Sequence, residues 1–159
     1  MSQSATVPPT GRRLPAGEYG YADLHSGDHY DTQAITLTES HIVAFAGITG
    51  DFFDVHMDDT FAREQGFPGR IAHGLLGLAL LEGLKTRSAV RLSGIATLGW
   101  NWTFCAPLLP GDRIYAEITV VSKRPTKRAD RGIVTFGLRM INQHQAIVQQ
   151  GETLLMMRQ

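Results

Sequence analysis

The sequence predicts an α+β domain in which an antiparallel sheet curls around one long apolar helix. Two observations lead to this prediction. Residues 72–85 form a helical pattern with almost no polar face, so this helix should be buried nearly all round. Four β-rich runs follow it, separated by turn-like or charged segments, at 95–104, 113–122, 133–142 and 147–157. A sheet built from these strands would cover the helix.

Composition and charge suit one soluble domain. The chain has 159 residues, of which 43% are hydrophobic, and we expect a single domain over residues 21–159. Residues 1–20 carry prolines and few large apolar groups, which predicts a flexible N-terminal arm. Fifteen basic residues balance fifteen acidic ones, so no global field favours nucleic acid or a membrane as a partner. With a lone Cys105, no apolar run of membrane-spanning length and no signal peptide, a cytoplasmic location is expected.

The elements before the long helix follow from local patterns. A β-rich alternation over 29–37 predicts a strand, and Thr38 then looks like a helix cap. Helix runs through 42–46 and breaks at the two glycines of 47–50. A second, short helix is predicted over 61–65, before a glycine and a proline stop it. Two small helices therefore stand between the first strand and the long helix.

The long helix contains Gly74, Gly77 and Gly83, each of which disfavours helix by roughly 1 kcal/mol relative to alanine. Close packing against other elements would compensate for this cost. The order of strand, small helices, apolar helix and four strands is the outline of a hotdog fold. Its sheet has open edges, and pairing with a second copy covers such edges, so a homodimer is expected.

The turn between the first two helices carries a candidate catalytic pair. Asp51 and His56 lie five residues apart in a segment rich in polar groups and aromatic rings. A carboxylate and an imidazole that point into one pocket can hold a water and move protons near neutral pH. Taken alone, the pair fits a turn-capping aspartate and a structural histidine better.

A second segment adds to this pair. Residues 66–74 lead a glycine-containing loop directly into the start of the apolar helix. Free N–H groups at a helix start, together with the helix dipole, suit a developing oxyanion, and Gly74 has no side chain to block the approach of a ligand. A glycine needed only for packing is the alternative. For an acyl thioester, the oxyanion would be the enolate formed when water adds at C3.

These segments resemble the MaoC-like (R)-specific enoyl-CoA hydratases of the hotdog superfamily. The family motif Gly-Asp-x-Asn-Pro-x-His is similar to residues 50–56, and its Pro-x-x-His-Gly helix start is similar to residues 70–74. The resemblance continues at 98–104 and 107–112 and spans about 36–155. It implies hydration of 2-enoyl-CoA to (R)-3-hydroxyacyl-CoA, or the reverse dehydration, by a hydro-lyase. No cofactor is implied beyond the coenzyme A that the substrate carries.

The resemblance also implies roles for individual residues. Asp51 and His56 would be the catalytic pair, one deprotonating water while the other supplies a proton to C2, in an order that the sequence leaves open. The Gly74 amide would contact the thioester carbonyl, with His73 as a neighbour in the site. The remaining histidines lack metal-ligand spacing and the chain has neither a P-loop nor a dinucleotide motif, so no metal and no further cofactor are expected.

The chain departs from the family pattern in three places, which involve four residues. Phe53 and Asp54 replace Asn-Pro, which adds a carboxylate that could raise the pKa of Asp51 or His56. Arg70 replaces a proline and would place a fixed positive charge beside the oxyanion site. Glu82 stands where some relatives carry a serine, so the inner pocket could be more polar.

Two further groups of residues are candidates for substrate contacts. Aromatic side chains that could line an acyl pocket, although each also fits ordinary core, are Phe52, Phe53, Phe67, Trp100 and Trp102. The two tryptophans are two residues apart and should share one face of a strand. The basic run 123–131 could meet the phosphates of coenzyme A, or could simply be solvated. Its candidate contacts are Lys123, Arg124, Lys127 and Arg128.

Two other functions stay open at this point. Hotdog relatives include acyl-CoA thioesterases, in which a carboxylate-activated water attacks the carbonyl instead of C3. A non-catalytic protein that binds acyl thioesters is a second alternative, suggested by the changes at Phe53, Asp54 and Glu82. The aspartate-to-histidine spacing favours hydration over hydrolysis.

Overall fold

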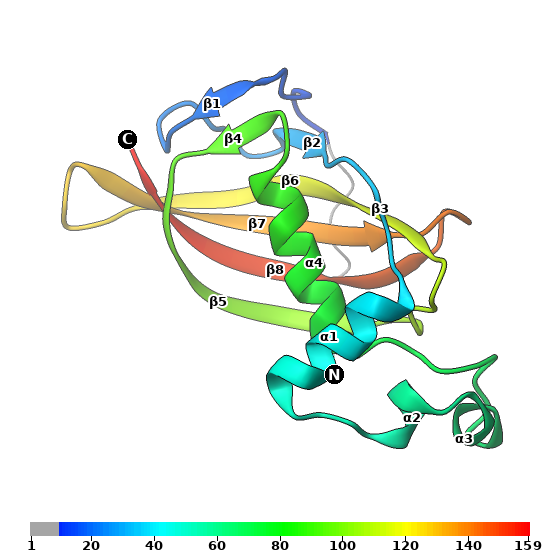
Figure 1. Cartoon of the computed structure of the whole chain (residues 1–159). Helices are drawn as coiled ribbons and strands as arrows, with labels where there is room; N and C mark the ends of the chain where they lie inside the picture. Colours follow the sequence, from blue (N-terminus) through cyan, green and yellow to red (C-terminus); the bar gives the residue numbers. More distant parts are fainter. Residues whose placement is uncertain (1–9) are drawn as a thin grey trace.

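A computed structural model describes residues 10–159 as an antiparallel sheet wrapped around one helix (Figure 1). The main sheet has the strand order β2-β6-β7-β8-β5, and β3 also pairs with β6. The central helix is α4 (Gly74–Thr86). The strands of the sheet are β2 (His29–Asp31), β3 (Ile35–Thr36), β5 (Gly94–Phe104), β6 (Arg113–Pro125), β7 (Arg131–Ile141) and β8 (Ile147–Arg158). The predicted hotdog arrangement is confirmed, and the four predicted long strands all form.

The burial pattern of β6 and β7 explains how the sheet forms the core, and an irregularity in their pairing explains part of its curvature. Alternate residues of β6 are buried, as expected for a strand with one covered face, whereas β7 in the middle of the sheet is buried along most of its length. A register shift between Val120 and Ser122 interrupts the β6–β7 ladder. Such bulges bend a strand and increase its twist, which helps the sheet to wrap around α4.

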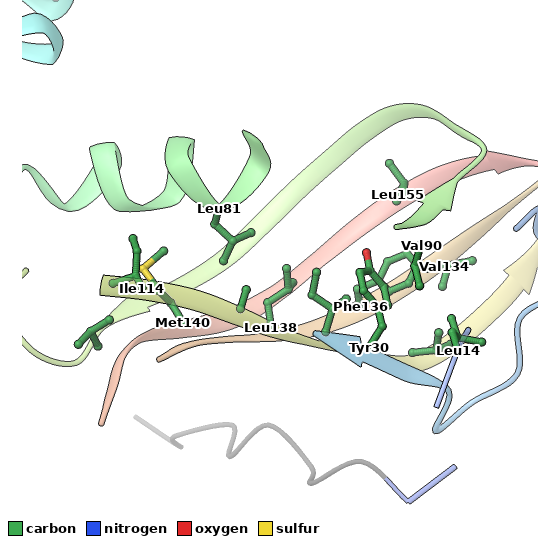
Figure 2. Close-up of a cluster of buried hydrophobic side chains, with 14 of the residues drawn as sticks. Leu14, Tyr30, Leu81, Val90, Ile114, Val134, Phe136, Leu138, Met140 and Leu155 are labelled. Carbon is green, nitrogen blue, oxygen red and sulfur yellow. The ribbon is translucent and has the colours of Figure 1, made fainter. Parts of the chain in front are cut away.

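The core lies between α4 and the concave face of the sheet (Figure 2). Leu81 of α4 is fully buried and belongs to the same cluster as Phe136, Leu138 and Met140 of β7. The prediction that the helix is buried nearly all round is wrong for the single chain, because Leu75 is 61% exposed. Leu75, Ala79 and Thr86 form an exposed stripe along the helix, beside the edge strand β5.

Three small helices precede α4: α1 (Glu39–Thr49), α2 (Asp54–Met57) and α3 (Asp59–Glu64). The predicted cap of α1 is confirmed, since the Thr38 side chain accepts a hydrogen bond from the His41 N–H. The turn predicted between the two small helices contains α2, a single helical turn that the sequence pattern does not reveal. Figure 1 shows α1 beside the first turn of α4, with α2 and α3 beyond it.

Of the flexible arm predicted over residues 1–20, residues 1–9 lie outside the described residues. From residue 10 onward the prediction is wrong. Leu14 is buried in the core, and β1 (Gly17–Tyr19) pairs in parallel with β4 (Val90–Leu92). Ion pairs of Arg12 with Asp28 and of Arg13 with Asp31 add to these contacts, so partners elsewhere in the chain order a segment whose composition looked unstructured. None of the helices in residues 10–159 is long and apolar enough to cross a membrane.

Candidate active site

The loop that carries Asp51 begins at a left-handed turn at the end of α1. Gly50 has a φ of 78°, a conformation that side chains disfavour, and its N–H donates to the Ala46 carbonyl at 2.8 Å. The Asp51 carboxylate then accepts a hydrogen bond from the Phe53 N–H at 3.3 Å, and its side chain is 52% exposed. The turn therefore holds the carboxylate at the surface of the pocket, where a ligand can reach it.

His56 lies in α2, with its ring fixed by one backbone hydrogen bond. Its Nδ1 lies 2.8 Å from the Ile71 carbonyl oxygen. Because a carbonyl can only accept, Nδ1 carries the proton and Nε2 keeps its lone pair. The Ile71 N–H donates in turn to the Val55 carbonyl at 3.1 Å, so α2 and the loop before α4 are tied together.

His73 connects the two predicted segments. It is 3% exposed and is the N-cap residue of α4, and its Nε2 donates to the Asp51 carbonyl oxygen at 2.8 Å. Its ring packs on that of His56, with a centroid distance of 3.8 Å and an interplanar angle of 30°. The sequence predicted His73 as a neighbour of the pair, and in the structure it fixes the Asp51 backbone and one face of the His56 ring.

The surroundings of His56 favour its neutral form. Burial lowers the pKa of His56 most, and the adjacent His73 lowers it further, whereas the hydrogen bond to Ile71 and the Asp51 carboxylate act in the opposite direction. Asp54, which the sequence suggested could raise this pKa, has no part in the shift. A neutral imidazole with a free Nε2 can accept a proton at neutral pH.

The start of α4 faces the same pocket. No side chain caps this helix, and within residues 10–159 no group accepts a hydrogen bond from the Gly74 or Leu75 N–H. A Cβ added at Gly74 would lie 2.8 Å from the Phe104 ring, so glycine is needed there for close packing. Both interpretations of Gly74 thus hold: it packs against β5 and leaves its N–H free for a ligand.

Gln149 is a site residue that sequence reasoning missed. It is 2% exposed, its Nε2 donates to the Gly74 carbonyl at 3.0 Å, and its Oε1 accepts from Trp102 Nε1 at 3.0 Å. A Cβ at Gly77 would lie 2.3 Å from the Gln149 Nε2, so this second glycine makes room for the amide. A polar residue at an inward position of a predicted strand, opposite a glycine-rich helix, was the available signal.

These groups surround a cavity of about 530 Å3. Its polar residues are Thr49, Asp51, His56, His73, Cys105 and Gln149. Phe45, Phe67, Ile71, Ala72, Leu75, Phe104 and Leu108 contribute apolar walls. A largely apolar cavity with a few converging polar groups is typical of a small-molecule site.

The predicted aromatic wall is only partly present. Phe67 lines the cavity, whereas Phe52 and Phe53 are more than half exposed, and the Phe53 ring stands edge-on to His56 at 6.4 Å. Trp100 and Trp102 share one strand face as predicted, with ring centroids 5.5 Å apart. Both pack on the core, and Trp102 is connected to the site by its hydrogen bond to Gln149.

Three predicted neighbours, Arg70, Glu82 and Asp54, do not line the cavity. The Arg70 guanidinium turns away from the cavity and forms an ion pair with Glu39 of α1 at 2.6 Å, so it does not place its charge beside the oxyanion position. Glu82 is two turns along α4 and lines a different cavity, where it pairs with Lys85. Asp54 lies in the first turn of α2, exposed to solvent.

The basic run is far from the site within one chain. Strand pairing puts Arg124 opposite Ile133, whereas Gln149 pairs with Phe104 at the other end of the sheet. In Figure 1 the β6–β7 turn lies at the opposite end of the molecule from α1 and α2. Lys123 donates to the carbonyls of Tyr21 and Leu24, and Arg128 pairs with Asp130. These two side chains therefore have structural partners, which the spacing of charges could not show.

One group of side chains in residues 10–159 could hold a metal ion. Asp51, His56 and His73 each offer a ligand atom, and these atoms lie within 4.8 Å of one another. One nitrogen of each imidazole is already bonded to a carbonyl, so each ring has a single nitrogen left for a proton, a water or an ion.

Comparison with known proteins gives a consistent set of relatives. The family model described as MaoC like domain matches residues 23–139. Protein MaoC of Klebsiella aerogenes is 38% identical over 112 residues, which are 70% of this chain and 32% of that longer protein. The (R)-specific enoyl-CoA hydratase of Aeromonas caviae is 31% identical over 116 residues, covering 73% of this chain and 83% of the enzyme.

A solved structure agrees with these relatives. The MaoC-like dehydratase from Rhodospirillum rubrum superposes with a TM-score of 0.82 at 31% sequence identity. The match covers 89% of this chain and 97% of that one. A match of this extent includes most of the fold.

Proposed function

The chain belongs to the family of MaoC-like domains, and we propose that it hydrates a 2-enoyl thioester to the (R)-3-hydroxyacyl thioester, or catalyses the reverse dehydration. The observation that carries this proposal is the convergence of three groups on one cavity. These are the Asp51 carboxylate, the free Nε2 of His56 and the unpartnered N–H of Gly74. Relatives named as hydratases and dehydratases support the same reaction class.

In the proposed reaction, water is held between the Asp51 carboxylate and His56. The neutral Nε2 of His56 accepts a proton from the water as its oxygen bonds to C3 of the enoyl group. The electron pair of the C2–C3 double bond moves onto the thioester oxygen, where the Gly74 N–H and the positive end of α4 stabilise the enolate. The enolate then collapses as the proton returns from the imidazolium to C2. The net change is the addition of one water, with no oxidation or reduction.

His73 has a supporting role in this scheme. Its hydrogen bond to the Asp51 carbonyl and its packing against His56 keep the two reacting groups in one arrangement. Its ring also disfavours a positive charge on His56, which keeps His56 neutral before the water reacts. A base that is neutral before the reaction can take up the proton of the water.

We also propose that the chain works as a homodimer on acyl groups carried by coenzyme A. The edge strand β5 exposes Ile95, Leu98 and Phe104, and Leu75 of α4 is exposed beside it. An apolar edge of this kind is normally covered by another strand, and a second copy of β5 could supply one. Light scattering coupled to gel filtration tests this: a mass twice that of the 17.5 kDa chain supports the proposal, and a monomer at micromolar concentration contradicts it.

The reaction is tested by following enoyl absorbance and free thiol together. Crotonyl-CoA and a longer 2-enoyl-CoA should lose their conjugated absorbance without releasing thiol, and chiral analysis should show the (R)-alcohol. Release of thiol would instead indicate a thioesterase. Tight binding without either change would indicate a thioester-binding protein. Each of these two results would contradict the proposed hydration.

A further inference from the structure

A second cavity, of about 600 Å3, lies at the other end of α4 from the candidate active site. Like the first cavity it has apolar walls, which here are formed by Leu92, Ile95 and Leu155. It differs in its charged residues, Glu82, Lys85 and Arg91, all of which line it. Neither the predicted chemistry nor the proposed mechanism uses this group of charges.

Lys85 is the most unusual member of the group. Its side chain is only 7% exposed, its Nζ lies 2.6 Å from a Glu82 carboxylate oxygen, and the same Nζ lies 5.4 Å from the centroid of the Trp100 ring. Buried lysines are uncommon and are retained when their ammonium group has partners. An ammonium group has three donors, and Glu82 takes one of them. Lys85 can therefore bind a further acceptor in the cavity.

Tyr30 carries a buried hydroxyl in the core cluster that also contains Leu155 of the cavity wall. Its ring is buried in the core, and its hydroxyl has no hydrogen-bond partner within residues 10–159 (Figure 2). Burial raises the pKa of Tyr30, and the Glu82 carboxylate raises it further. Tyr30 does not line the cavity, so the charged donors that a ligand meets there are those of Lys85 and Arg91.

The two cavities lie along one stripe of α4. Leu75 lines the first cavity, while Glu82 and Thr86 line the second, and these residues follow one another at spacings of seven and four. At 1.5 Å per residue, Glu82 lies about 12 Å along the helix from Gly74. An acyl chain whose thioester is held at Gly74 can thus extend along the stripe towards Lys85.

We propose that the second cavity receives the far end of the acyl chain and that this end carries a carboxylate. The proposal rests on the thioester hydration inferred above and names the substrate class of that site. Positive charges outnumber negative ones in the cavity lining, because Lys85 and Arg91 stand against the single carboxylate of Glu82. A methyl-ended chain would offer no acceptor to Arg91 or to the remaining donors of Lys85, whereas a terminal carboxylate would accept from both.

The wild-type protein provides the first test. Hydration rates are compared for 2-hexenedioyl-CoA, 2-octenedioyl-CoA and 2-decenedioyl-CoA and for the methyl-ended 2-enoyl-CoA of each length. At one length or more, kcat/KM for the carboxylated substrate should exceed that of its methyl-ended counterpart by about tenfold or more. If the methyl-ended thioesters are hydrated equally well or better at every length, this proposal is overturned and the hydration proposal stands. If no thioester is hydrated, the hydration proposal fails and this one fails with it.

Variants then test the charged residues. In the double variant Glu82→Gln with Lys85→Met, which leaves no unpaired buried charge, the preference for the carboxylated substrate should fall about tenfold while hydration of the methyl-ended substrate persists. Arg91→Gln changes an exposed side chain and should reduce the preference without affecting folding. Arg113→Met, at the exposed start of β6, is the matched control and should keep the wild-type preference. A preference unchanged in both cavity variants would overturn the proposal.

A phosphate of coenzyme A is another anion that these donors could bind. Inhibition by free coenzyme A, measured for the wild-type protein and for the double variant, distinguishes an acyl carboxylate from a coenzyme A phosphate as the ligand of the cavity. Equal inhibition of the wild-type protein and the double variant supports the acyl carboxylate as the ligand. Inhibition that weakens with the loss of Lys85 would assign the cavity to a phosphate and overturn the proposal.

Discussion

Replacing Gln149 with leucine should destabilise the protein and disturb the start of α4. The change keeps the side-chain volume similar but removes the donor to the Gly74 carbonyl and the acceptor of the Trp102 N–H. Each hydrogen bond of this kind contributes about 1 kcal/mol, so the loss is about 2 kcal/mol. For a domain of this size each 1 kcal/mol corresponds to roughly 2–4 °C, which gives a melting temperature about 4–8 °C lower.

Thermal denaturation followed by circular dichroism measures this effect. Gln33→Leu is the matched control, since Gln33 is exposed and its replacement should change stability by less than about 0.5 kcal/mol. Trp102→Phe removes the other end of the same chain of bonds, so its effect and that of Gln149→Leu should be less than additive in the double variant. An unchanged melting temperature for Gln149→Leu, or strictly additive effects, would refute the role assigned to Gln149.

Three other changes test separate parts of the structure. Activity should depend on neutral His56, whose pKa is lowered from 6.5. In a pH profile, kcat/KM should therefore be retained above that pKa and lost as the pH falls through it, with a midpoint below 6.5. His73→Gln keeps a donor for the Asp51 carbonyl but removes the neighbouring ring, so this midpoint should move to higher pH, and an unmoved midpoint would argue against the coupling. Gly74→Ala should lower kcat/KM by about tenfold or more through contact with the Phe104 ring, and Phe104→Leu should restore part of the loss; no rescue would mean that crowding is not the cause. Thr38→Ala removes the cap of α1 and should cost about 1 kcal/mol in urea denaturation, whereas an unchanged midpoint would show that the cap contributes nothing.

The architecture was largely predictable because it depends on periodic patterns. Apolar alternation located the four long strands, and the apolar helix at 72–85 required a sheet to cover it. The short elements were not predictable in the same way. Strands β1 and β4 have three residues each, and they form because they meet across the fold and not because of their own composition.

The site was predictable where its residues are close in sequence. Asp51 and His56 share one turn, and Gly74 opens the apolar helix, so local patterns were enough to nominate them. Gln149 lies 75 residues after Gly74, and only the pairing of β8 with β5 brings it beneath that glycine.

Side-chain direction was the main source of wrong predictions. Arg70 was expected beside the oxyanion site because of its position in the motif, and Lys123 was a candidate phosphate contact because of its charge. Each has a partner within the chain instead. Glu82 was expected to make the inner pocket more polar because it stands where some relatives carry a serine. Two helical turns carry it into the second cavity instead. Sequence spacing fixes distance along an element but does not show which neighbour satisfies a charge.

The most direct test of the account is the rate of enoyl-CoA hydration by His56→Ala and Asp51→Asn compared with the wild-type protein. Removing either group should lower kcat by roughly 10²–10⁴-fold, the usual contribution of general acid–base catalysis, while circular dichroism shows an unchanged fold. The double variant should be little worse than the poorer single variant, because the two groups act on one water. Hydration at the wild-type rate by both single variants would contradict the assignment of this pair to the chemistry.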